Sequence, residues 1–134
     1  MLRGPLQITI PPDRSLVSPI RLAASGMATG AGCSLDEIDD IKLVTGEVLL
    51  VLIEQGCGNP LSITMAQCRD AFTMRARTET SGFDEHRPEL ELCRTVLDQL
   101  CRIHSVELVA GDLRIRADYA VQSGASSEGR DRVR

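Results

Sequence analysis

Apolar residues along this chain recur with two periods, which predict both strands and helices. Leucine and isoleucine alternate with polar residues at 6–10, and Pro11-Pro12 ends this run because proline cannot donate to a strand ladder. The same alternation predicts further strands at 61–67, 71–78, 104–109 and 113–119, the last two forming a hairpin around Gly111. Apolar residues spaced three and four apart predict helices at 16–29, 35–55 and 89–103.

The second of these helices has the clearest boundaries. Ser34 is followed three residues later by Glu37, which is the pattern of a capping box, and Gly56 ends the helix. Its second half, 48–53, is apolar on every side, so we expect it to be buried on every side. The acidic residues near its start, Glu37, Asp39 and Asp40, are expected to form a solvated face.

The order strand, helix, helix, strand, strand, helix, strand, strand predicts an α+β fold. We expect a two-layer sandwich, with a mixed, mostly antiparallel sheet and the helices on one face. The helix-free face would then be available to a partner. Residues 1–120 are predicted to form a single domain, and the polar residues 121–134 a disordered tail.

Composition narrows the classes of protein to consider. Of the 134 residues, 43% are hydrophobic and 25% charged, which excludes a fully disordered chain. No apolar run approaches the roughly 20 residues that span a bilayer, and no secretory signal is apparent, so a cytoplasmic protein without a membrane partner is expected. A net charge of -4 and an aromatic content of 2% argue against nucleic-acid binding.

The five cysteines do not form a metal-binding pattern. None is part of a C-x-x-C pair, and the two histidines add no cluster, so the usual structural zinc site is excluded and no metal is expected. Reduced thiols in a reducing compartment are the simplest interpretation, and redox sensing is the alternative.

The run Ser34-Leu35-Asp36-Glu37-Ile38-Asp39-Asp40-Ile41-Lys42-Leu43-Val44-Thr45-Gly46-Glu47 resembles the anti-sigma serine kinases. These small bacterial proteins belong to the GHKL ATPase group, which includes histidine-kinase catalytic domains. The resemblance implies the histidine-kinase-like ATPase fold over roughly residues 6–119. It also implies that Arg21, in the first predicted helix, contacts a protein partner.

In those kinases the second helix carries a glutamate that acts as general base, an asparagine that helps to hold Mg²⁺, and a histidine, four residues apart. The resemblance places the glutamate at Glu47, the asparagine at Val51 and the histidine at Gln55. Valine has no oxygen to offer a cation that requires near-octahedral oxygen ligation. The loss should disable phosphoryl transfer, leaving Glu47 as a relic base.

Two other nucleotide motifs of the family are also degenerate. The adenine-binding box, Asp-x-Gly-x-Gly-Phe-Asp, corresponds to 78–84, where Thr78 replaces the aspartate, Thr80 replaces a glycine and Gly82 remains. Thr78 can donate a hydrogen bond but cannot supply the carboxylate. The glycine-rich phosphate box before the third helix has no counterpart, because no glycine lies between Gly82 and Gly111.

The sequence therefore predicts a catalytically inactive, anti-sigma-type regulator that binds a sigma factor or an anti-anti-sigma protein in a partner-switching circuit. A homodimer and no cofactor are expected. The alternative is an active ATP-dependent serine kinase that uses Glu47 as base and an oxygen of Gln55 or Glu79 for Mg²⁺. A third possibility is a sensor that holds a small molecule in the vacated nucleotide pocket.

Overall fold

The computed structural model describes residues 3–122, with side chains from residue 5 onward. Along the chain the elements are β1 (Arg3–Ile10), a single 3₁₀ turn η1 (Arg14–Leu16), α1 (Val17–Gly30), α2 (Leu35–Gln55), β2 (Leu61–Gln67), β3 (Ala71–Glu79), α3 (Pro88–Leu100), β4 (Ile103–Val109) and β5 (Asp112–Ala120). This is the predicted order of strands and helices.

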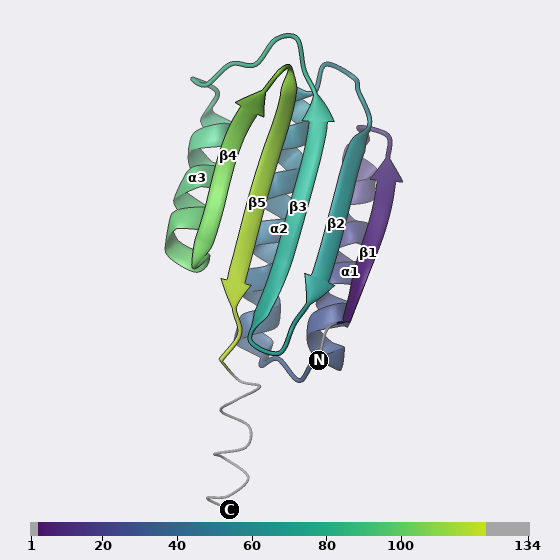
Figure 1. Ribbon diagram of the computed structural model, residues 1–134, viewed down its shortest axis with the longest axis vertical. Coiled ribbons are helices and arrows are strands. Elements are labelled where there is room, and N and C mark those ends of the chain that lie inside the picture. Colours follow the sequence, from purple (N-terminus) through teal and green to yellow (C-terminus); the bar gives the residue numbers. More distant parts are fainter. Residues whose placement is uncertain (1–2, 123–134) are drawn as a thin grey trace, which may run out of the picture.

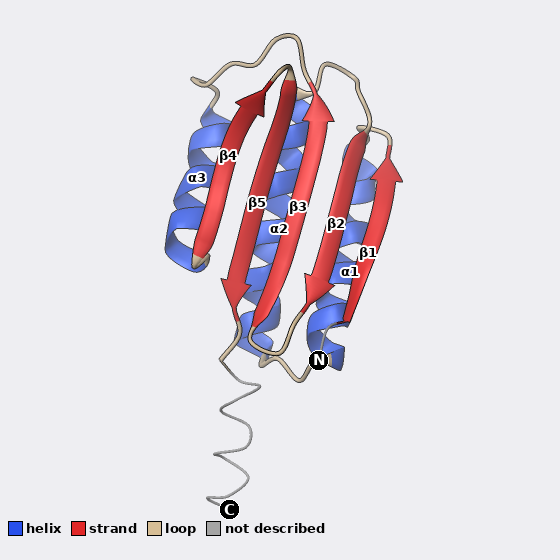
Figure 2. Cartoon of the chain, in the orientation of Figure 1, coloured by secondary structure: helices blue, strands red, loops and turns tan. Residues whose placement is uncertain are grey.

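The five strands form one sheet in the order β1-β2-β3-β5-β4, and the helices lie together behind one face of it (Figure 1). The α+β prediction is thus confirmed, and so is the placement of the helices on a single face (Figure 2). All four strand pairings are antiparallel, where a mixed sheet was expected. The reason is that β5 inserts between β3 and β4 and runs antiparallel to both.

The core lies between the helices and the sheet. The second half of α2 is its centre, with Val48, Leu49, Val51 and Leu52 at most 1% exposed, while Leu50 and Ile53 keep partial exposure. Alternate residues of the central strands meet this helix, so one face of each strand is apolar and the other is polar. Within residues 3–122, no helix is both long and apolar enough to cross a membrane.

The start of α2 confirms the capping box and corrects the expected solvated face. The Ser34 amide donates to Glu37 Oε1 at 2.9 Å, and the Glu37 amide donates to Ser34 Oγ at 3.1 Å. Glu37 is only 7% exposed, and its other oxygen accepts from the Gln122 amide at 2.7 Å. Asp40 accepts from the hydroxyl of Tyr119 at 2.8 Å. Both carboxylates are engaged because the end of β5 runs past the start of the helix.

Most boundaries agree with the predicted ones within one residue, and two differ by three residues. The first strand begins at Arg3, and α3 ends at Leu100 although helical spacing was expected to continue to 103. The Arg102 amide donates to Asp118 O at 2.9 Å, so pairing with β5 takes over there. The expected tail at 121–134 lies outside the described residues from 123 onward. Val121, where the tail was expected to begin, is described, and its amide donates a hydrogen bond to Asp70 O.

The β4–β5 hairpin closes through a two-residue turn in which both residues have positive φ. These are Ala110, with φ of 52°, and Gly111, with φ of 80°, between the paired residues Val109 and Asp112. This is the geometry of a type I′ turn, in which Asn-Gly is preferred and alanine pays a steric penalty.

Replacing Ala110 by asparagine should therefore stabilise the protein. We expect Ala110→Asn to raise the free energy of unfolding by about 0.5–1 kcal/mol in urea titrations. Ala110→Val serves as the opposite control, since a β-branched side chain tolerates positive φ poorly and should lower stability. Equal stabilities for the two variants would contradict this description of the turn.

Candidate functional site

The residues that correspond to the family's nucleotide motifs lie where α2 ends beside the end of β3. Glu47, Val51 and Gln55 follow one another at four-residue spacing on α2, as predicted. The structure brings Gln55 together with Thr80, whose hydroxyl donates to the backbone carbonyl of Gln55 at 2.5 Å. The Gly82 amide donates to Thr80 Oγ1 at 3.2 Å, so this part of the loop folds onto the helix end.

Gln55 clamps the loop at 80–87 to the end of α2. Its Nε2 donates to Asp84 O at 2.7 Å and its Oε1 accepts from the Asp84 amide at 2.9 Å, so both ends of the carboxamide bind one backbone unit. The residue is 2% exposed. A buried amide whose oxygen and nitrogen are both hydrogen-bonded to the backbone has a structural role. The oxygen of Gln55 already accepts one hydrogen bond.

Glu54 fastens the same loop at a second point. Its carboxylate forms ion pairs with Arg14 in η1 and with Arg87 just before α3, the latter at 3.2 Å. This node joins three segments that are far apart in sequence. Sequence analysis did not single out Glu54, because neither arginine lies at helical spacing from it.

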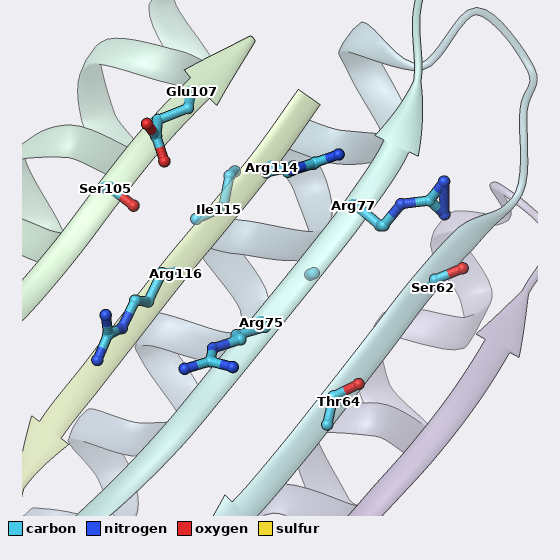
Figure 3. A pocket seen from close by; sticks show the side chains of 10 residues that line it. Ser62, Thr64, Arg75, Arg77, Ser105, Glu107, Arg114, Ile115 and Arg116 are labelled. Carbon is cyan, nitrogen blue, oxygen red and sulfur yellow. The ribbon is translucent and has the colours of Figure 1, made fainter. Parts of the chain in front are cut away.

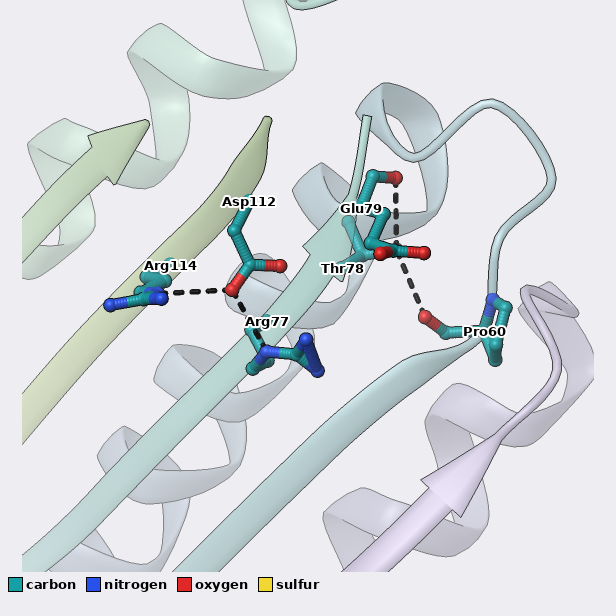
Figure 4. Close-up of polar contacts among 6 residues, drawn as sticks. All are labelled: Pro60, Arg77, Thr78, Glu79, Asp112 and Arg114. Atoms are coloured by element: carbon teal, nitrogen blue, oxygen red, sulfur yellow. Dashed lines mark hydrogen bonds and ion pairs between the residues drawn. The ribbon is translucent and has the colours of Figure 1, made fainter. Parts of the chain in front are cut away.

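Thr78, at the adenine-binding position, also makes an internal bond. It is 1% exposed, and its hydroxyl donates to Pro60 O at 3.0 Å (Figure 4). The single hydroxyl proton is therefore directed at the backbone that leads into β2. Glu79 follows on the opposite face of the sheet, as strand alternation requires, and so it points away from Glu47 and Val51.

Glu47 and Arg21 form one polar site between α1 and α2. Burial raises the pKa of the Glu47 carboxyl, and the positive charge of Arg21 only partly offsets this rise. Gly46 leaves room for the arginine, since a Cβ on Gly46 would lie 3.2 Å from Arg21 Cδ. Arg21 is half-buried, and its Nε has no hydrogen-bond partner among the described residues.

Cys57 is a reactive group that the sequence analysis did not distinguish from the other cysteines. It lies two residues after the end of α2, with φ of 54°, and is exposed. The backbone amide of Ser81, aided by the Ser81 hydroxyl, lowers the pKa of its thiol. Its Sγ lies 3.7 Å from Thr80 Oγ1, so the thiol sits over the same loop that Gln55 holds.

The site offers no obvious ligand set for a cation. Within residues 3–122, no group of three or more histidine, cysteine, aspartate or glutamate side chains is placed to hold a metal ion. Val51 is 1% exposed, and its isopropyl group packs into the core at the position of the family's asparagine.

A cavity of about 380 Å³ lies on the other face of the sheet, on the side without helices (Figure 3). Arginines from β3 and β5 line it. None of the nucleotide-motif positions takes part in it, so the chain carries two separate polar regions, one on each side of the sheet.

Comparison with models of known protein families finds no match, and comparison with curated proteins finds no significant one.

Proposed function

We propose that this protein is a catalytically inactive, anti-sigma-type regulator that acts in the cytoplasm by binding other proteins. Its partner would be a sigma factor or an anti-anti-sigma protein in a partner-switching circuit, and the protein would act as a homodimer. The observation that carries the proposal is the Gln55 clamp on Asp84 beside the buried Val51. At these positions the resembled kinases need groups that face Mg²⁺ and nucleotide.

The α1–α2 surface supports a role in protein binding. Arg21 is half-buried on this surface, and a guanidinium is well suited to a protein interface because it offers several donors on a planar group. The same helices carry Leu22 and Leu43, which are 63% and 45% exposed. An arginine beside exposed leucines combines directional and apolar contacts.

The active serine kinase is the second candidate, and the raised pKa of Glu47 favours it, because a general base works best when its pKa approaches neutrality. What counts against it is the lack of a residue to bind Mg²⁺ in the described part of the chain. Of the two residues that were expected to supply oxygen, Gln55 already binds Asp84, and Glu79 faces the other side of the sheet.

Calorimetric titration with ATP, with and without Mg²⁺, separates the two functions. We expect no heat that depends on Mg²⁺, because residues 3–122 contain no cluster of three or more metal-binding side chains and Val51 stands at the position of the resembled kinases' asparagine. Micromolar binding that requires Mg²⁺, with transfer of phosphate to a serine of a bound protein, would replace the proposal by the kinase.

Partner binding has its own measurement. Affinity capture from the native cell, followed by mass spectrometry, should recover a sigma factor or an anti-anti-sigma protein. Arg21→Glu should reduce that recovery by about tenfold or more, whereas Arg94→Glu, on the exposed face of α3, should not. Equal recovery with both variants would remove Arg21 from the interface.

A further inference from the structure

The cavity on the helix-free face contains four arginines in a two-by-two array. Arg75 of β3 is the direct cross-strand partner of Arg116 of β5, and Arg77 is the partner of Arg114. Figure 3 shows these side chains extending from the two central strands into the cavity. Like charges directly opposite each other destabilise a sheet, and here two such pairs follow in succession. Ion pairs with aspartate offset part of this repulsion but, among the described residues, leave Arg75 without one, and a local violation of this kind is typical of functional sites.

Two buried aspartates hold part of this array in place. Asp112 Oδ2 lies 2.9 Å from Arg77 Nε and 3.0 Å from Arg114 Nε (Figure 4). Asp118 Oδ2 lies 2.7 Å from Arg116 Nη2. Burial raises the pKa of Asp112, but the hydrogen bonds and charges of Arg77 and Arg114 outweigh burial and lower it, so the carboxylate stays ionised.

The arginines keep binding capacity after these contacts. Asp112 engages Arg77 and Arg114 through Nε, and no hydrogen bond from their terminal nitrogens is found among the described residues. Arg75 has no ion pair within residues 5–122. Even with the carboxylate of Glu107, which also lines the cavity, positive charges outnumber negative ones.

The remaining lining favours a small polar ligand over a protein surface. Hydroxyls of Ser62, Thr64 and Ser105 surround the arginines. Ile115, on the floor of the cavity, is 2% exposed and directs its side chain toward the helices. Protein interfaces usually add an aromatic or large aliphatic anchor to their arginines, and no exposed side chain of that kind is among the described residues that line this cavity.

We infer that the cavity binds a small molecule that carries two or more phosphate groups. Guanidinium groups bind phosphate in a bidentate manner, and hydroxyls complete its coordination. Successive arginine pairs start about 7 Å apart along the strands, because they are two residues apart, and their long side chains can converge on neighbouring phosphate groups of one ligand. A volume of about 380 Å³ falls within the range of small-ligand pockets.

Titration with pyrophosphate in the absence of Mg²⁺ tests this inference. We expect saturable binding by the wild-type protein and a loss of about tenfold in affinity in Arg75→Gln, since one charge-assisted contact is removed. Arg94→Gln removes the same charge from α3 and should bind like the wild type. Thermal melts without ligand should show Arg75→Gln to be folded and at least as stable, because a like-charge pair is relieved.

Absence of pyrophosphate binding, or equal weakening by both substitutions, would overturn the inference. Tighter binding of citrate than of pyrophosphate would overturn the assignment to phosphate, because citrate offers carboxylates of similar charge. The outcome is independent of the proposed function. ATP held by this cavity would bind without Mg²⁺ and would bind about tenfold more weakly in Arg75→Gln, whereas ATP at the α2 site would need Mg²⁺ and would be unaffected by that substitution.

Discussion

Cys57 should be the first of the five thiols to react with an aromatic disulfide reagent near neutral pH, and it should react far faster than the buried Cys93 and Cys101. It is exposed, and the Ser81 amide holds its pKa below the ordinary value of 9.0. Burial raises the pKa of Cys93 to about 12 and that of Cys101 to about 12. Each pKa unit changes the thiolate fraction tenfold, so the two buried thiols carry at least about a thousandfold less thiolate.

The experiment is a stopped-flow labelling time course. Cys57→Ser should remove the fastest phase, and Cys93→Ala should leave it in place. In denaturant all five cysteines should react at similar rates, because burial and the local hydrogen bonds are lost. A fast phase that persists in Cys57→Ser would show that this thiol is not the activated one. A thiolate of higher pKa is intrinsically more nucleophilic, which narrows the difference in labelling rate between Cys57 and the buried thiols. Their lower thiolate fraction and their burial have a much larger effect.

Gly56→Ala should be severely destabilising, although the backbone there is ordinary. The φ of Gly56 is -82°, which alanine adopts without strain. A Cβ would lie 2.8 Å from Leu52 O and 2.8 Å from Thr78 Oγ1, closer than such atoms approach in proteins. We expect the free energy of unfolding to fall by about 3 kcal/mol, measured by urea denaturation, because the end of α2 must move away from β3.

Gly26→Ala is the matched control. Gly26 lies within α1, and an added Cβ would meet nothing within 4 Å. Alanine should raise stability there by about 0.5–1 kcal/mol through its higher helix propensity. Two glycines at helical φ should thus give effects of opposite sign. A Gly56→Ala variant as stable as Gly26→Ala would mean that β3 and α2 are less closely packed than described.

Local signals predicted most of the fold. The capping box at Ser34, the proline stop after Ile10 and the turn at Gly111 each act through a few neighbouring residues, and each is present in the structure. The error at the end of α3 has a different origin. Cys101 and Ile103 continue a helical spacing, but Ile103 is paired with Asp118 in the sheet, and a sequence pattern cannot weigh that distant partner.

The same limit applies to the candidate sites. The resemblance to the anti-sigma serine kinases pointed to Val51 and Gln55 as replacements, and the four-residue spacing after Glu47 placed all three on one side of a helix. It did not predict that Gln55 would clamp Asp84, which is 29 residues away. The arginine array depends on the register of β3 against β5, so its four members are neighbours only once the strands have paired.

The register of β1 has a consequence for how the chain reaches this structure. Ile10 is paired with Leu61, and the whole α1–α2 helical hairpin lies between them along the chain. Pairing β2 with β3, or β4 with β5, closes only a short loop. Pairing β1 with β2 closes a much longer loop, which costs more chain entropy. β1 should therefore pair later than the two hairpins, and until it does β2 offers an unpaired edge to any other extended chain.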